Sequence, residues 1–227
     1  MKLFKNLMFL FLSIGIFSCD MTDLELQDNP NAVTPENASI NDLYNNIQLS
    51  FRNVFVSAQS APGALARMYH QGSYLYLSAT SPNTMNGLWN NAYSTLFPDI
   101  DALLNLAEAR GLDIHAGTAK IMKAYTLLTL VDLLGDVPLS EAGQGTDVIS
   151  PSADPGSQVY AAAMGLLDEA IGQLSGTSAS RPAVDNYYGG SATKWIKAAN
   201  SIKLKAALNM GDAGTINSLV SGGNLIS

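Results

Sequence analysis

The stretch KIMKAYTLLTLVDLLGDVPLSEA, residues 120–142, decides the fold. From Thr118 to Leu134 the chain is apolar around most of its circumference when it is drawn as a helix. A helix on the surface would keep one polar face, so the pattern predicts a helix that is buried between neighbouring helices. Gly135 is expected to end this helix, and Pro138 prevents it from resuming.

Apolar residues recur at helical spacing on both sides of this stretch. We expect a helix that begins at Ser39 or Asn41, a short one over about 64–70, and longer ones over about 88–109, 157–174 and 193–210. Pro98 should break or kink the helix over 88–109. Ser157 and Asp212 are the expected caps of the helices that follow them.

Two segments, LVDLLGD and AALNMGD, both end an apolar helix in Gly-Asp. Their glycines, Gly135 and Gly211, are 76 residues apart, close to two tetratricopeptide repeats of roughly 34 residues plus a loop. The predicted class is therefore all-α, a tetratricopeptide-like helical-repeat scaffold with long irregular loops. No polar capping repeat follows at 222–227, which predicts a chain that is truncated at its C-terminus.

The composition excludes several classes of function. Hydrophobic residues make up 47% of the chain and charged residues 14%, unlike a disordered protein. Asp and Glu outnumber Lys and Arg by 19 to 12, so nucleic acid and anionic lipid surfaces are poor partners. The single cysteine excludes an internal disulfide and a cysteine-rich zinc site.

The start of the chain has the pattern of a lipoprotein signal peptide, predicted over 1–18. A positive start precedes an apolar run over 7–17, which is shorter than the roughly 20 residues of a membrane span. Cys19 follows Ile-Phe-Ser, which reads as a lipobox whose thiol is diacylated and becomes the new N-terminus; the alternative is an accidental cysteine near a cleavage site. Residues 19–37 are predicted to be a flexible tether and 38–227 the helical domain.

Four stretches, in order along the chain, resemble the amino-terminal half of the SusD-like/RagB-like nutrient-binding lipoproteins. They are LELQDNPNAVT (24–34), LWNNAYSTLFPDIDALLNLA (88–107), the stretch 120–142 quoted above, and DNYYGGSATKWIKAANSIKLKAAL (185–208). Leu134, Ile202 and Lys205 depart mildly from the family's usual residues, and members of the family are about twice as long.

The resemblance implies a lipid-anchored protein on the outer membrane, facing the cell exterior. Such proteins form a lid on a TonB-dependent SusC-like transporter and capture oligosaccharides or, in some members, peptides. Helices form the scaffold and irregular loops bind the ligand. The acidic residues Asp20, Asp23 and Glu25 loosely fit the surface-export signal of the family.

No pattern in the sequence indicates catalysis. The two histidines, His70 and His115, lack the spacing of metal ligands, and Asp99 and Asp101 point to different faces of their helix. No phosphate loop, nucleophile elbow or metalloprotease motif occurs. We therefore expect a binding protein that is not an enzyme and uses no cofactor and no metal.

The candidate ligand contacts are aromatic and amide side chains, because sugar rings stack on aromatic faces and their hydroxyls bond to polar groups. Tyr74, Tyr76, Asn83 and Asn86 are the first candidates, since the loop before the W-x-x-x-Y helix contributes to binding in the resembling family. Trp89 is a further candidate, with core packing as its alternative.

For three other aromatic residues and one turn, a structural role is predicted or stays open beside ligand contact. Trp195 lies on an apolar helix face, which predicts a core position. Tyr187 and Tyr188 precede two glycines in a loop, and both core packing and ligand contact stay open for them. The turn Gly135-Asp136-Val137-Pro138 is predicted to be structural.

Two hypotheses about function follow. The first is a glycan-binding lipoprotein that delivers its ligand to a transporter. The second is a helical-repeat adaptor for another protein, without a small-molecule site, because tetratricopeptide folds serve both purposes and a fold does not determine function.

We expect Cys19→Ala to release the protein from membranes, because acyl chains contribute about 0.8 kcal/mol per buried CH₂ and anchor firmly when several share one residue. Fractionation of cells into membrane pellet and supernatant measures this. If the variant still pellets with membranes, the lipobox interpretation is wrong.

Overall fold

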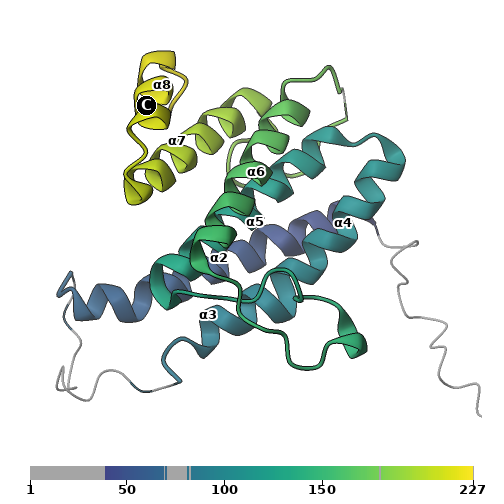
Figure 1. Cartoon of the computed structure of the whole chain (residues 1–227). Coiled ribbons are helices and arrows are strands. Elements are labelled where there is room, and N and C mark those ends of the chain that lie inside the picture. Colours follow the sequence, from purple (N-terminus) through teal and green to yellow (C-terminus); the bar gives the residue numbers. More distant parts are fainter. Residues whose placement is uncertain (1–38, 69, 71–80, 82, 179, 227) are drawn as a thin grey trace, which may run out of the picture. The chain divides into compact units, whose positions relative to one another are not determined.

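The computed structural model describes residues 39–68, 70, 81, 83–178 and 180–226, within one compact unit, Ala38–Ser227. Its α-helices are α2 (Ile40–Leu65), α3 (Asn86–Asn90), α4 (Phe97–Arg110), α5 (Asp113–Leu134), α6 (Gly156–Leu174), α7 (Ala192–Met210) and α8 (Ala213–Gly222) (Figure 1). The described residues contain no β-strand, only one isolated bridge. The all-α prediction is confirmed.

Helix α5 is the buried centre of the unit, as its sequence predicts. It contacts α2, α4, α6 and α7, and fifteen of its 22 residues are buried. It begins at Asp113, five residues before the predicted start. The residues from Ile114 onwards are also buried, so packing extends the helix toward its N-terminus.

Helices α5 and α6 form the closest pair and run antiparallel. At one end, a Cβ atom on Gly117 would lie 2.8 Å from Cγ of Leu174, and at the other a Cβ on Gly156 would lie 2.9 Å from Val131. Both distances are too short for a real contact, so the two helices approach as closely as they do only because glycine stands at each end.

Ion pairs connect the central helices at their edges. Lys120 on α5 donates to Glu169 on α6 at 2.6 Å, and Lys203 on α7 pairs with Asp168 on α6. The lysine side chains are mostly buried while both carboxylates are exposed, so each lysine stem covers apolar surface and its charged end meets a carboxylate beside water.

The W-x-x-x-Y segment forms one continuous helical stretch despite Pro98. A π-helical segment, Asn91–Leu96, joins α3 to α4, and the amide of Phe97 donates to the carbonyl of Ala92. Proline has no amide to continue the α-helical pattern and clashes with the carbonyl four residues before it. The wider turn accommodates this change, so the α-helix is interrupted before Pro98 by a π-bulge and continues as α4 after it.

Helix α2 begins as predicted and ends differently. The hydroxyl of Ser39 accepts a bond from the amide of Asp42 at 3.4 Å, which confirms Ser39 as the cap. The helix then continues through Pro62 to Leu65. The separate short helix predicted over about 64–70 is wrong, because residues 66–68 form the turn that ends α2.

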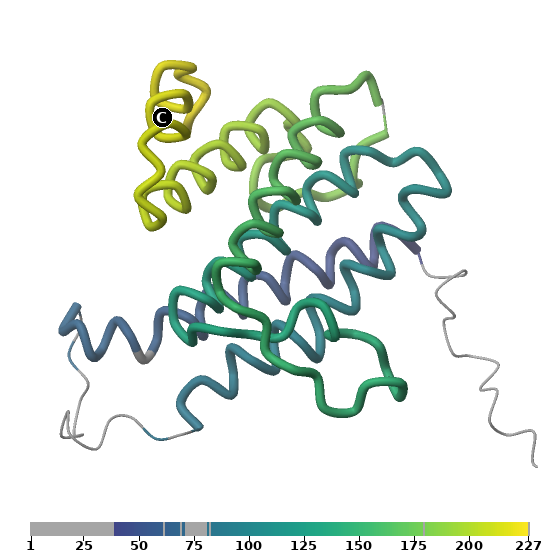
Figure 2. Tube along the Cα trace, viewed as in Figure 1, coloured from purple at the N-terminus to yellow at the C-terminus, as the bar shows by residue number. Residues whose placement is uncertain are grey.

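The Gly-Asp-Val-Pro turn after α5 is fixed by its backbone conformation and by hydrogen bonds to two other segments, which agrees with its predicted structural role. Gly135 has φ 84° and ψ −126°, a conformation that glycine adopts readily. Val137 forms an antiparallel bridge with Asp154. The hydroxyl of Tyr93 donates to the carbonyl of Pro138 at 2.7 Å, so the W-x-x-x-Y helix and the turn support each other. Figure 2 shows the path of the chain from this turn to the start of α6 (Gly156–Leu174).

The carboxylate of Asp154 organises the residues after this turn. It accepts bonds from the amides of Leu139 and Ser140, at 2.7 and 2.9 Å, and from the Ser140 hydroxyl at 2.8 Å. These bonds hold the pKa of Asp154 below its usual value, and the bond from the Ser140 amide has the largest effect. The long loop is thus ordered where it leaves the helical core.

Asp136 supplies the cap of α6, and the prediction that Ser157 caps this helix is wrong. The helix already begins at Gly156, whose amide donates to Oδ1 of Asp136 at 2.8 Å. The preceding Pro155 has no side chain that can accept such a bond. A carboxylate from the turn therefore meets the unpaired amides at the start of α6, where the helix dipole favours negative charge.

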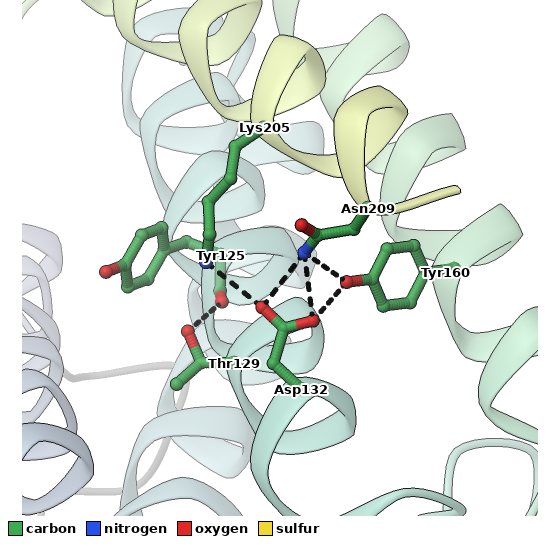
Figure 3. A network of polar contacts seen from close by, with 6 residues as sticks. All are labelled: Tyr125, Thr129, Asp132, Tyr160, Lys205 and Asn209. Carbon is green, nitrogen blue, oxygen red and sulfur yellow. Dashed lines mark hydrogen bonds and ion pairs between the residues drawn. The ribbon is translucent and has the colours of Figure 1, made fainter. Parts of the chain in front are cut away.

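Asp132 joins three helices near their ends, as Figure 3 shows. Its carboxylate on α5 accepts bonds from the Tyr160 hydroxyl on α6 and, on α7, from Lys205 at 3.0 Å and Asn209 at 3.2 Å. After α7, the carboxylate of Asp212 accepts from the amide of Thr215 at 3.1 Å and caps α8, as predicted.

No helix among the described residues is both long and apolar enough to span a membrane.

We predict that Asp136→Ala lowers the free energy of unfolding by about 0.5–2 kcal/mol, because α6 loses the carboxylate at its first amide. Denaturant unfolding measures the change. Asp147→Ala is the control, since Asp147 is an exposed carboxylate in the same loop, and it should change stability far less. Equal effects of the two substitutions would contradict the capping role.

His115 makes the stability of the core depend on pH. Its side chain is 2% exposed, neither ring nitrogen has a hydrogen-bond partner, and it meets Tyr44 edge-on at 5.6 Å. Burial lowers the pKa of His115 below its ordinary value. The unfolded chain therefore takes up a proton at a higher pH than the folded one does.

We expect the free energy of unfolding to fall as the pH decreases below about 6.5, the pKa of an unperturbed histidine. His115→Phe should remove this part of the pH dependence, whatever its effect at neutral pH, and His70→Phe, at an exposed position, should retain it. Denaturant unfolding at several pH values is the measurement. A slope that is the same in His115→Phe and in the original protein would show that another group is responsible.

Candidate functional site

Two surfaces of the described unit carry exposed aromatic residues, and the larger is a groove over α5. Phe51 and Phe55 of α2 form one wall, and Trp195 and Ile202 of α7 lie on the opposite side. Its lining is completed by the α5 residues Ile121 and Tyr125, by Tyr187 and Tyr188 of the loop before α7, and by Arg52, Ala198, Ser201, Lys205 and Ile226. The volume of the groove is about 430 Å³. We call it the α2–α7 groove.

One carboxylate shapes the loop that closes the α2–α7 groove. Asp185 accepts bonds from the amides of Tyr187 and Tyr188 at 2.9 and 3.2 Å, from the amide of Gly190 at 2.8 Å, and from the indole nitrogen of Trp195 at 2.7 Å. Gly190 has φ 73°, which glycine tolerates best. The loop therefore folds around Asp185 and fixes its tyrosines against α7.

Gln48 attaches the same loop to α2. Its side chain, 2% exposed, donates to the carbonyl of Val184 at 3.1 Å and accepts from the amide of Asn186 at 2.7 Å. The Tyr187 hydroxyl in turn donates to the backbone carbonyl of Gln48 at 3.1 Å. A buried amide that satisfies both its donor and its acceptor sites holds this wall of the groove in place.

The aromatic rings of the α2–α7 groove contact one another edge-on. Phe51 lies 5.5 Å from Tyr125 and 5.6 Å from Tyr187, and Trp195 lies 5.9 Å from Tyr187 and 5.0 Å from Tyr188, between ring centroids. These distances are typical of favourable aromatic pairs. The rings thus form a connected wall with a fixed shape.

The second surface lies on α3 and the π-helical segment and contains three predicted ligand residues. Asn83 and Asn86 are exposed, and their side chains are joined by a hydrogen bond of 3.3 Å. Trp89 is 38% exposed, which contradicts core packing, the alternative considered for it. Its ring lies 4.6 Å from that of Tyr93 at 39°. We call these four residues the Trp89 surface.

A smaller pocket adjoins the Trp89 surface through Tyr93. It has a volume of about 280 Å³, and its lining includes Phe97 and Asp101 of α4, Lys123 of α5 and Pro138. Lys123 pairs with Asp101 and lies 5.7 Å from the ring of Phe97. An aromatic wall therefore stands beside a carboxylate and an ammonium group in one small space.

The other predicted positions have mixed outcomes. Trp195 is 3% exposed and belongs to the core, as predicted. Tyr187 and Tyr188, for which both possibilities stayed open, form a wall of the α2–α7 groove. Tyr74, Tyr76 and Cys19 lie outside the described residues.

The carboxylates behave as the sequence suggests. Asp99 accepts from Asn46 of α2 at 2.6 Å while Asp101 pairs with Lys123 of α5, so the two acids do face different neighbours. Burial raises the pKa of Asp99 above its usual value. Within the described part of the chain, no three His, Cys, Asp or Glu side chains are grouped so that they could hold a metal ion.

Sequence reasoning missed the α2–α7 groove as a surface. Its residues come from three helices, the loop before α7 and the segment after α8, at positions from 51 to 226, so no single stretch of sequence contains the groove. The pair Tyr187-Tyr188 beside two glycines was the one local signal that pointed to it.

Comparison with solved structures supports the fold. A SusD/RagB family protein from Bacteroides thetaiotaomicron matches with a TM-score of 0.71 at 20% identity, over 84% of this chain and 43% of its own. A chitin-binding protein matches with a TM-score of 0.69 at 22% identity, over 83% and 44%. A chitin-binding SusD homologue from Flavobacterium johnsoniae matches with a TM-score of 0.57 at 16% identity, over 76% and 41%.

This chain spans less than half the length of these three structures. No curated protein sequence matches it significantly. A family model matches residues 30–221, most of the chain, and describes SusD-like proteins as starch-binding and associating with the outer membrane. The resemblance in the four sequence stretches is thereby confirmed, and the chain belongs to the SusD-like family.

Proposed function

We propose that this protein is a lipid-anchored cell-surface protein that binds oligosaccharides at the Trp89 surface. The observation that carries the proposal is the exposed indole of Trp89, which lies 4.6 Å from the ring of Tyr93 and follows the exposed Asn83 and Asn86 in sequence, in a member of a starch-binding family. Two of the similar structures are of chitin-binding proteins, which also supports a glycan ligand.

The chemistry of the Trp89 surface suits a sugar. The apolar face of a pyranose ring packs on an aromatic ring, and its hydroxyls need donors and acceptors beside that ring. The amides of Asn83 and Asn86 provide both. The pocket beyond Tyr93, at about 280 Å³, is close to the lower end of the size range of small-ligand sites. Asp101 and Lys123 pair with each other in its wall, and each has further hydrogen-bonding capacity for a sugar hydroxyl.

Tyr74 and Tyr76 are proposed as further ligand contacts, since they precede the Trp89 surface in sequence. Cys19 is proposed as the lipidated residue that holds the protein at the outer membrane, facing outward. A TonB-dependent SusC-like transporter is the proposed recipient of the ligand, and co-purification of a large β-barrel with the protein would support this partnership directly.

We predict that Trp89→Ala weakens oligosaccharide binding at least about fivefold, or about 1 kcal/mol, because the stacking face is lost. Isothermal titration with a panel of malto- and chito-oligosaccharides is the measurement, and Trp89→Phe should retain more of the affinity. Phe55→Ala is the matched control, since Phe55 is an aromatic residue exposed in the α2–α7 groove.

The panel also separates the two hypotheses about function. If no oligosaccharide binds to the original protein, the glycan-binding function is wrong for this chain. If a glycan binds and Phe55→Ala weakens it while Trp89→Ala does not, the function holds and the assignment of the site is wrong.

A further inference from the structure

We propose that the pocket of about 280 Å³ beside Tyr93, called here the Tyr93 pocket, receives the acetamido group of a 2-acetamido sugar. The protein then prefers polymers of N-acetylated hexosamines to unmodified glucans. Because the sugar ring that carries the group stacks on Trp89, the proposal rests on the proposed function. Asp101, Lys123 and the apolar side chains of the pocket wall select the group.

Three aromatic rings lead from the Trp89 surface into the Tyr93 pocket. The ring of Tyr93 lies 4.6 Å from that of Trp89 and 5.2 Å from that of Phe97, between centroids. Trp89 is 38% exposed and Phe97 only 7%, so the row passes from a face that water reaches to a buried wall. Since Tyr93 borders both, a sugar on the indole has the pocket beside its edge.

The size of the Tyr93 pocket suits one substituent of a sugar. In β-1,4-linked glucose and N-acetylglucosamine polymers, the group on C2 is equatorial and projects sideways from the ring. It can therefore enter a pocket at the side while a face of the ring stays stacked. A volume of about 280 Å³ lies just below the roughly 300–1,000 Å³ of sites that enclose a whole drug-sized ligand.

The polar part of the pocket wall is an ion pair with hydrogen-bonding capacity left over. Lys123 donates to Oδ1 of Asp101, and in the described part of the chain neither side chain makes another hydrogen bond. An ammonium group has three donors and a carboxylate about four acceptor positions. The carbonyl of the acetamido group accepts from Lys123, whose side chain is 19% exposed, and Oδ2 of Asp101 accepts from a ring hydroxyl.

The remaining wall is apolar, and its loop side is already ordered. Asp154 accepts bonds from the amides of Leu139 and Ser140 at 2.7 and 2.9 Å, which fixes that side. The methyl of an acetamido group buries apolar surface against such a wall, whereas a hydroxyl is too short to cover it. The apolar side chains are those of Phe97, Pro98, Leu127, Leu139 and Ala142.

The balance of charge in the Tyr93 pocket disfavours charged sugars. An uronic acid would bring a carboxylate beside Asp101, and the amine of a deacetylated hexosamine would bring a cation beside Lys123. Each would meet a like charge and lose water on entering an apolar space. A neutral group with an acceptor and a methyl avoids both costs, and the acetamido group is such a group.

The test compares three hexasaccharides that share a β-1,4-linked backbone and differ at C2. They are the hexamers of N-acetylglucosamine, of glucose and of glucosamine. Isothermal titration in mildly acidic buffer, in which the glucosamine amines carry protons, is the measurement. The N-acetylated hexamer should bind at least about tenfold more tightly than either of the others.

Lys123→Met tests the polar contact. It removes the donor and leaves Asp101 without its cation, so the N-acetylated hexamer should bind at least about fivefold more weakly and the glucosamine hexamer more tightly. A purely structural role of Lys123 would not reverse the order in this way. Lys203→Met is the matched control, since Lys203 is 15% exposed, pairs with Asp168 and does not line the pocket.

Ala142→Leu tests the apolar wall independently of charge. The larger side chain occupies the space of the acetamido methyl and should remove most of the preference for the N-acetylated hexamer over the glucose hexamer. Thermal melts in the same buffer establish that each variant is folded.

The possible failures are distinguishable. Equal affinity for the N-acetylated and glucose hexamers would overturn the preference and leave the proposed function standing. A preference that survives both Lys123→Met and Ala142→Leu, or that falls equally in Lys123→Met and Lys203→Met, would show that the Tyr93 pocket is not its origin. No binding of any hexamer or malto-oligosaccharide would contradict the proposed function, and this proposal with it.

Discussion

The close approach of α5 and α6 is the constraint on which the rest of the structure depends. Gly117 meets Leu174 at one end of the pair, and Gly156 meets Val131 at the other, at distances that no Cβ atom permits. With α6 seated in this way, the first amide of α6 reaches Asp136 in the turn after α5. In that same turn, the carbonyl of Pro138 accepts a hydrogen bond from the hydroxyl of Tyr93. The position of the W-x-x-x-Y segment, and with it the Trp89 surface, therefore follows from the packing of two other helices.

The two aromatic surfaces differ in the state of their polar groups. In the α2–α7 groove, Asp185 and Gln48 use their hydrogen-bonding capacity to build the wall, and the rings remain as apolar surface. At the Trp89 surface the side chains of Asn83 and Asn86 bond to each other but are exposed to water, where a ligand can reach them. Aromatic content alone would not distinguish a sugar site from a protein-docking site; the availability of donors and acceptors does.

Sequence reasoning succeeded where the signal is local. The apolar circumference of α5 predicted its burial, and Ser39 and Asp212 were identifiable as caps because their partners lie three residues away. It failed where partners are distant. Asp136 caps a helix that begins 20 residues later, and the groove joins residues from 51 to 226. The π-bulge before Pro98 was missed because proline permits several local solutions, and the surrounding packing selects one.

The central claim is that this member of the SusD-like family binds glycan at the Trp89 surface and not in the α2–α7 groove. Amide hydrogen exchange, followed by mass spectrometry with and without a bound oligosaccharide, tests it most directly. The account predicts slower exchange in peptides that cover 83–101 and 138–143, with unchanged exchange over 48–55 and 185–202. Protection confined to 48–55 and 185–202 would contradict it.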